Sequence, residues 1–150
     1  MSNVNTVHNL LNPGWIVGFV DGEGCFFVGM SKNKTMKLGI QVLPEFVVVQ
    51  HLRDKKILDM FLEFFGCGVV RINHGDRLMF RVRGQEALMH KILPFFDKYP
   101  LKTSKQQNYL LFREIVYLID QKQHLTPTGI RKIERLKEQM NTKVFFLVFI

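Results

Sequence analysis

Two acidic residues near the N-terminus are the side chains in this sequence best placed to do chemistry. Asp21 and Glu23 stand at the end of the segment 13–24, PGWIVGFVDGEG. If this segment is a helix, both carboxylates lie at its C-terminal end, where the helix dipole disfavours them by about 0.3–1 kcal/mol. Two acids in this unfavourable place indicate a bound cation. The alternative is a DGEG turn whose acids only face solvent.

Three glycines in the same segment, Gly14, Gly18 and Gly22, recur at a spacing of four and would share one helix face. Each glycine inside a helix costs roughly 1 kcal/mol relative to alanine, so another interaction must offset that cost. Close approach of a second helix would do so, and a second copy of the chain would bring two sets of acids together at a two-fold axis. Mg²⁺ suits such a sparse carboxylate site. The alternative is that Gly14 and Gly22 only mark the helix ends.

The elements that position these residues follow from hydrophobic periodicity and from the residues that start and stop helices. The expected elements are, in order, a helix over about 12–22, strands over 25–30 and 38–50, a helix over 52–65, strands over 68–72 and 77–82, and helices over 85–97, 103–119 and from 126 onward. Antiparallel hairpins alternating with helices predict one α+β domain, 1–150, with helices on one sheet face and the other face free. We assign no function to the apolar stretch VFFLVFI in the tail 141–150.

Composition narrows the class of partner. The formal charge of +8 on 150 residues favours a polyanion, either nucleic acid or an anionic membrane surface. Cys25 and Cys67 are too few for a disulfide framework, so we expect a reducing compartment and burial of both thiols. No stretch reaches the roughly 18 apolar residues of a membrane span, and no signal peptide is visible, which predicts a soluble protein.

The segment WIVGFVDGEG resembles the LAGLIDADG motif of homing endonucleases, with residues 16–24 matching its nine positions. Further segments resemble that family in the same order along nearly the whole chain, namely FVVVQHLRD, LEFFGCGVVRI, YPLKTSKQQNYLLF and HLTPTGIRKIERLKEQMN. The resemblance implies an αββαββα fold whose saddle-shaped antiparallel sheet lies on double-stranded DNA, and site-specific, Mg²⁺-dependent double-strand cleavage. Because the motif occurs once, the resemblance also implies a homodimer paired through Gly14, Gly18 and Gly22.

The resemblance assigns the metal site to the end of the motif. Glu23 would ligate the metal directly with help from the Gly22 carbonyl, and Asp21 is a second candidate catalytic residue of the motif. Mn²⁺ would substitute for Mg²⁺, and Ca²⁺ would support DNA binding without cleavage.

Three further residues resemble the family's catalytic positions. Gln50 would lie beside the active site and position a water molecule. Lys105 or Lys102 would approach the scissile phosphate, and we prefer Lys105 because the helical register after residue 103 fits better. The alternative is that each lysine is an ordinary residue at the start of a helix.

Basic side chains gather on the two expected hairpins. The expected DNA-binding residues are Ser31, Lys32, Asn33, Lys34, Lys37, Gln41, Arg71, His74, Arg77, Arg81 and Arg83. They would contact phosphates or, as arginines, guanine, although basic hairpins in a basic protein are also often merely solvated. In the long strand, alternation predicts the outward set Gln41, Leu43, Glu45 and Val47, which is poor in donors and points to thymine methyl contacts or shape readout.

Two other functions stay open. A group I intron maturase of the same fold would bind its own intron RNA without cleaving DNA. Peripheral membrane association would use the basic surface and the apolar tail. By the resemblance, the host compartment is expected to be a chloroplast or mitochondrion, with a bacterial or phage host as the alternative.

Overall fold

The computed structural model describes residues 11–140, and the predicted apolar tail 141–150 lies outside them. Its four strands are β1 (Gly24–Lys32), β2 (Ile40–His51), β3 (Val69–His74) and β4 (Arg77–Val82), which form one antiparallel sheet in the order β1-β2-β4-β3. The α-helices are α1 (Pro13–Glu23), α2 (Lys55–Phe65), α3 (Gln85–Ala87), α4 (Leu93–Lys98), α5 (Lys105–Asp120) and α6 (Pro127–Gln139). The predicted α+β class and the order of its elements are confirmed.

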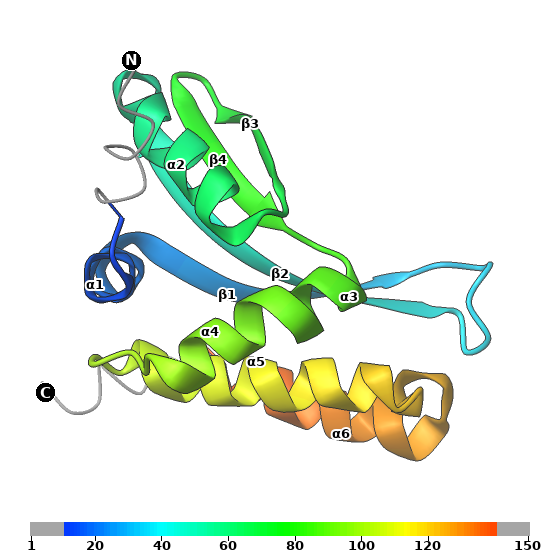
Figure 1. The fold of residues 1–150 in the computed structure, drawn as a ribbon. Coiled ribbons are helices and arrows are strands. Elements are labelled where there is room, and N and C mark those ends of the chain that lie inside the picture. Colours follow the sequence, from blue (N-terminus) through cyan, green and yellow to red (C-terminus); the bar gives the residue numbers. More distant parts are fainter. Residues whose placement is uncertain (1–10, 141–150) are drawn as a thin grey trace, which may run out of the picture.

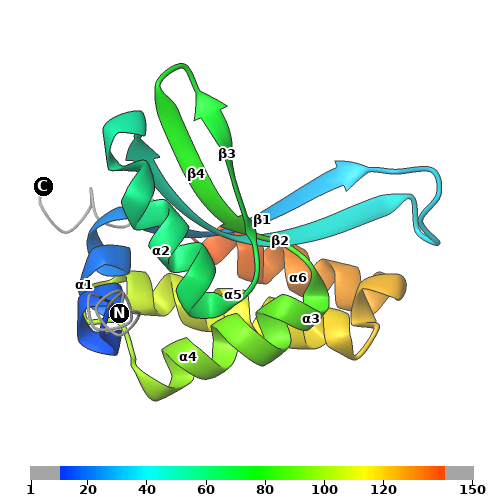
Figure 2. The ribbon, with the colours of Figure 1, turned by 45° about the horizontal axis from the view of Figure 1, so that its top comes forward.

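Helices cover one face of this sheet. In Figure 1, α2 lies against the β3–β4 half, and α4 and α5 lie against the β1–β2 half, with α6 behind α5. Figure 2 shows the β1–β2 hairpin projecting past the helices. Phe26, Phe46 and Phe80 line the covered face, where their rings pack on those of Phe96 and Phe65 from the helices.

Local capping explains where several helices begin and end. The Asn12 side chain accepts a hydrogen bond from the Trp15 N–H at 2.8 Å, and the Thr126 hydroxyl accepts one from the Gly129 N–H at 3.0 Å. Gly66 ends α2 with a φ of 63°, a left-handed conformation that glycine adopts without strain. These boundaries agree with the predicted ones to within about one residue.

Two helical segments differ from expectation. The helix predicted from residue 52 begins with a short 3-10 turn, Leu52–Asp54, and becomes α-helical at Lys55. The helix predicted over 85–97 is helical throughout but contains a wide π turn, Leu88–Ile92. Pro94 follows that turn and has no N–H to donate to the preceding turn, which accounts for irregular helical bonding here.

Strand alternation sets which residues face away from the helices. Along β2, Val42, Pro44, Phe46 and Val48 are buried under the helices, whereas the intervening residues Gln41, Leu43, Glu45 and Val47 are not fully buried and lie on the uncovered face. The predicted outward set is therefore confirmed. We call this uncovered side of the sheet the free face.

The expectation that both cysteines are buried is wrong. Cys25 is exposed and Cys67 is partly buried. Cys25 precedes the buried Phe26 in β1, so alternation turns its side chain to the free face, and strand register outweighs the general tendency of free cysteine to be buried. Among residues 11–140, no helix combines the length and the hydrophobicity that a membrane crossing requires.

Candidate active site and nucleic-acid interface

The C-terminal end of α1 is fastened to the start of α5 by Asp21. Its carboxylate accepts hydrogen bonds from the Lys102 N–H at 2.8 Å, the Thr103 N–H at 3.2 Å and the Thr103 hydroxyl at 2.7 Å. Burial opposes ionisation of this carboxyl group, but the hydrogen bonds outweigh burial and hold the pKa of Asp21 below its usual 3.8. The charge of Asp21 is thus satisfied by backbone and hydroxyl donors of the same chain.

Lys105 places a positive charge at the negative end of α1. Its ammonium group donates hydrogen bonds to the carbonyl oxygens of Val20 at 2.8 Å and Asp21 at 3.0 Å. Burial lowers the pKa of Lys105 below 10.5, although the charges of Asp21 and Glu23 oppose this shift. This lysine offsets part of the negative charge at the end of α1, and the bound metal ion expected from the two acids stays a prediction.

Glu23, the last residue of α1, is placed differently from Asp21. Its side chain is exposed and makes no hydrogen bond or salt bridge to the other residues of the described range. The chain turns directly into β1 at Gly24, where an added Cβ would lie 2.6 Å from Val20 Cγ1 and 3.0 Å from the Val20 carbonyl oxygen. Only glycine fits this close turn without a shift, and the turn leaves the Glu23 carboxylate available to a ligand.

Gln50 and Lys102 flank this end of α1. The last pair of the β1–β2 ladder joins Gly24 to Val48, so Gln50 follows two residues beyond it, level with the junction of α1 and β1. Lys102 donates its backbone N–H to Asp21 while its side chain stays exposed. Of the two lysines considered, Lys105 is the one whose ammonium group contacts the backbone of the motif.

The glycine face of α1 is open. Gly14, Gly18 and Gly22 are all exposed, and a Cβ added at Gly18 or Gly22 would meet nothing within 4 Å. A cavity of about 350 Å³ runs along this face, lined by Gly14, Val17, Gly18, Asp21, Lys98, Tyr99, Pro100 and Lys102. Packing within the described chain therefore gives no reason for glycine at positions 18 and 22.

Four of the predicted DNA-binding arginines lie along the β3–β4 side of the sheet. Arg77 and Arg81 occupy β4 positions that alternate with buried Leu78 and Phe80, and Arg71 in β3 is paired with Met79. These three are on the free face. Arg83 directly follows β4, and its Nε donates to the Glu45 carboxylate in a salt bridge, so this arginine is held rather than free.

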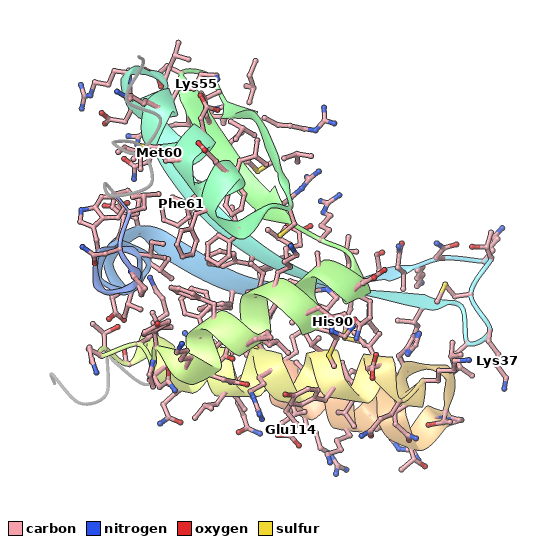
Figure 3. All side chains as sticks on the ribbon, in the orientation of Figure 1. Lys37, Lys55, Met60, Phe61, His90 and Glu114 are labelled. Atoms are coloured by element: carbon pink, nitrogen blue, oxygen red, sulfur yellow. The ribbon has the colours of Figure 1, made fainter. Side chains whose placement is uncertain are left out.

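The β1–β2 hairpin carries the lysines at its tip. Lys32, Lys34 and Lys37 are exposed, and Figure 3 shows Lys37 at the tip of the hairpin. The Asn33 side chain instead organises the turn, because its oxygen accepts the Thr35 N–H at 3.0 Å.

The same hairpin aligns polar side chains on its strands. The Asn33 amide donates to Gln41 Oε1 at 3.3 Å, and Gln41 is paired across the ladder with the exposed Ser31. Gln41 therefore keeps its own amide N–H groups for another acceptor.

One contact in the second hairpin was not expected from the sequence. His51 Nε2 lies 2.8 Å from Asp76 Oδ2, and His51 Nδ1 accepts the Arg53 N–H at 3.0 Å, so the proton is on Nε2 and is donated to the carboxylate. His74 itself is exposed beside the turn. This contact ties the turn to the end of β2, and residues 25 positions apart carry no local signal of it.

Comparison with known proteins places these features in a family. Residues 16–116 match the LAGLIDADG endonuclease family. The crystal structure of the homing endonuclease I-TnaI superposes with a TM-score of 0.86 and 52% identity over 89% of this chain and 90% of that one. I-LtrWI bound to target DNA gives 0.86 and 37% over 89% of this chain and 45% of that one.

Curated relatives of this chain are also named as endonucleases. A probable intron-encoded endonuclease 2 of Neurospora crassa is 34% identical over 93% of this chain and 30% of its own length. The DNA endonuclease I-CeuI of Chlamydomonas moewusii is 30% identical over 67% of this chain and 50% of its own length. The chain thus spans half or less of these two relatives. It belongs to the LAGLIDADG endonuclease family.

Proposed function

We propose that this chain is a homing endonuclease that acts as a homodimer and hydrolyses both strands of a long pseudo-palindromic DNA site with Mg²⁺. The observation that carries the proposal is the end of α1, where an exposed Glu23 adjoins a glycine face that the described chain leaves open. Residues 1–150 would act as one LAGLIDADG domain. An organellar location is part of the proposal and is supported by the intron-encoded relatives.

The proposed homodimer is supported by the open face. Glycine at positions 18 and 22 lowers helix stability by roughly 1 kcal/mol each, and a second helix at close range would offset that cost. The adjoining cavity of about 350 Å³ offers room beside the helix for side chains of such a partner. A copy of α1 placed there would bring two Glu23 carboxylates together, one from each chain.

The residues present suit a sparsely coordinated metal. Within residues 11–140 no group of three or more His, Cys, Asp or Glu side chains could hold an ion. Mg²⁺ needs only one or two carboxylates because it retains waters and takes phosphate oxygens. Glu23 and the Gly22 carbonyl would hold it, with Mn²⁺ as a substitute and Ca²⁺ supporting binding without cleavage. When bound, the ion would stabilise charge on the phosphate and lower the pKa of a water.

The other residues of the site would position the reacting groups. Lys105 would place its positive charge beside the scissile phosphate, and Gln50 would orient a water by hydrogen bonding. Asp21 would hold the loop that carries Lys102, with its side chain exposed toward the same end of the helix. DNA would lie on the free face, against the arginines of β3 and β4 and the lysines at the tip of the β1–β2 hairpin.

Cleavage of the intronless host allele tests this function. The purified chain should cut a duplex spanning the intron insertion site on both strands in Mg²⁺, and should bind it uncut in Ca²⁺. Glu23→Gln should bind in Ca²⁺ but fail to cut. Glu114→Gln is the matched control, since Glu114 is an exposed carboxylate on α5, away from the sheet (Figure 3). Equal cleavage by Glu23→Gln and the wild type would exclude the proposed metal role.

The oligomeric state has its own test. Gly18→Leu fills the open helix face, so the variant should sediment as a folded monomer and lose double-strand cleavage. Thr128→Leu adds the same side chain at an exposed position of α6 and should remain dimeric. A dimeric Gly18→Leu protein would contradict pairing through α1. Binding to intron RNA with no DNA cleavage by the wild type would favour the maturase alternative.

A further inference from the structure

Within the four strands of residues 11–140, the free face carries one acidic side chain among its arginines. Glu45 in β2 faces Arg83, which directly follows β4, because Phe46 is paired with Val82 and the next pair outward is Glu45 with Arg83. The Glu45 side chain is only 12% exposed, whereas that of Arg83 is 44% exposed. On the other side of Glu45, the ladder places Phe27. The acid is therefore enclosed by its neighbours, and the arginine is the member of the pair that reaches solvent.

The geometry of the pair fixes which part of Arg83 is available. Nε donates to Glu45 Oε1, so the side edge of the guanidinium is occupied by the carboxylate. The guanidinium has further donors on its terminal Nη groups, arranged as a planar fork. A fork held from behind by a carboxylate has lost much of its rotamer freedom before any ligand arrives, which lowers the entropic cost of a directional contact.

Charge argues against a simple phosphate contact at this position. The carboxylate neutralises the arginine, so the pair adds little net attraction for the DNA backbone. An unpaired Glu45 would repel phosphates, and selection for backbone binding alone would favour its absence. The pair also lies between the two central strands of the sheet rather than at a hairpin tip. A fixed guanidinium fork, in a pair with no net charge, is suited to bidentate hydrogen bonding with a base edge, and guanine O6 and N7 are the acceptors that match it.

We propose that Arg83, oriented by Glu45, reads one guanine in each half of the target. The inference rests on the proposed function, since it needs DNA on the free face. Arg83 is the specificity-determining residue, and Glu45 is a positioning residue that acts through it. The exposed Phe27 beside the pair has no donor or acceptor and would not compete for the same base.

Selection of binding sites from a randomised duplex pool tests the inference without a known target. The full chain is used in Ca²⁺ as the wild type, Arg83→Lys, Glu45→Gln and the control Arg131→Lys, an exposed arginine on α6. The wild type should select guanine at one position in each half-site. Both pair variants should lose that preference by about 5- to 150-fold at the same position and keep the others, whereas Arg131→Lys should keep it.

Each outcome discriminates. A uniform loss of affinity in Arg83→Lys with no change of base preference would overturn the inference, because it would mark a phosphate contact. Loss in Arg83→Lys but not in Glu45→Gln would overturn the positioning role of Glu45. If the wild type bound no DNA, the proposed function would fail together with the inference, whereas selective binding with an unchanged profile in both variants would overturn the inference alone.

Discussion

The Asp21 carboxylate and the Thr103 hydroxyl, 82 residues apart in sequence, are joined by a hydrogen bond of 2.7 Å. The same hydroxyl accepts the Lys105 N–H at 3.2 Å. One threonine thus links the acidic end of α1 to the first residue of α5. The Lys105 ammonium group in turn donates hydrogen bonds to two carbonyl oxygens of α1. These hydrogen bonds hold the end of α1 and the start of α5 together. Asp21 therefore has a clear structural role in the motif.

Thr103→Val should lower the free energy of unfolding by about 1–3 kcal/mol, because it removes a hydrogen bond to a charged carboxylate with little change of shape. Thr103→Ser keeps the hydroxyl and should retain most of the stability. Urea unfolding at one fixed protein concentration measures both. In a double-mutant cycle with Asp21→Asn, the losses should be less than additive, and strict additivity would show that the two side chains are not coupled.

Local signals in the sequence predicted much of the fold and part of this site. Asn12 and Thr126 start helices because each caps a backbone N–H three residues on, which a sequence reveals directly. The outward positions of β2 follow from a period of two. Contacts between distant elements carry no such signal. The Asp21–Thr103 bond, the Lys105 contacts and the Arg83–Glu45 pair all depend on how helices and strands are brought together, which a single sequence does not show.

The acids at the end of α1 illustrate the difference between what local sequence signals predict and what contacts between distant elements add. Two acids at a helix C-terminus led to the expectation of a bound metal ion, which stays a prediction. The sequence contains several lysines, and helical register alone favoured Lys105 without showing what it contacts. The structure shows its ammonium group on the carbonyls of Val20 and Asp21. Of the two acids of the motif, Glu23 is the one whose carboxylate no hydrogen bond from the described residues satisfies.

Gly129→Ala should destabilise the fold by about 1–3 kcal/mol or more through overpacking. An added Cβ at Gly129 would lie 1.8 Å from the carbonyl oxygen of Gln123, a backbone atom that cannot rotate away. Thr128→Ala, at the exposed neighbouring position, is the control and should stay close to the wild type. Thermal or urea unfolding compares the two. Equal stability of Gly129→Ala and the wild type would mean that the turn before α6 is less closely packed than described.

Burial of His124 should lower the free energy of unfolding in mild acid. Its Nδ1 is buried and has no partner among residues 11–140, and burial lowers the pKa of His124 below 6.5. The unfolded chain therefore binds a proton on this ring at a higher pH than the folded chain does. Stability should fall as pH drops below about 6.5 toward the folded-state pKa. His124→Gln should remove this part of the pH dependence.

The control for that experiment is His90→Gln, since His90 is exposed on the π turn and the difference between the two variants cancels the general effect of losing a histidine. Urea unfolding between about pH 8 and pH 5 gives the free energies. The gap between wild type and His124→Gln should stay constant above about pH 7.5 and change as the pH falls below about 6.5. A constant gap would show that the ring titrates alike in both states.

The hairpin lysines should govern the salt dependence of DNA binding. Replacing Lys32, Lys34 and Lys37 with glutamine removes charge from the exposed hairpin tip, where phosphate binding is proposed. The slope of log K against log salt should fall in magnitude by about 0.9 for each phosphate that a lysine no longer neutralises, while base preference stays unchanged because phosphates carry no sequence information.

The matched control replaces Lys122, Lys132 and Lys137, which removes the same charge from the turn before α6 and from α6 itself. If both triple variants reduced the slope equally, binding would respond to net charge and the hairpin would have no special role. A reduced slope in the hairpin variant alone, with the Arg83 preference intact, would separate the residues that hold the DNA backbone from those that read its bases.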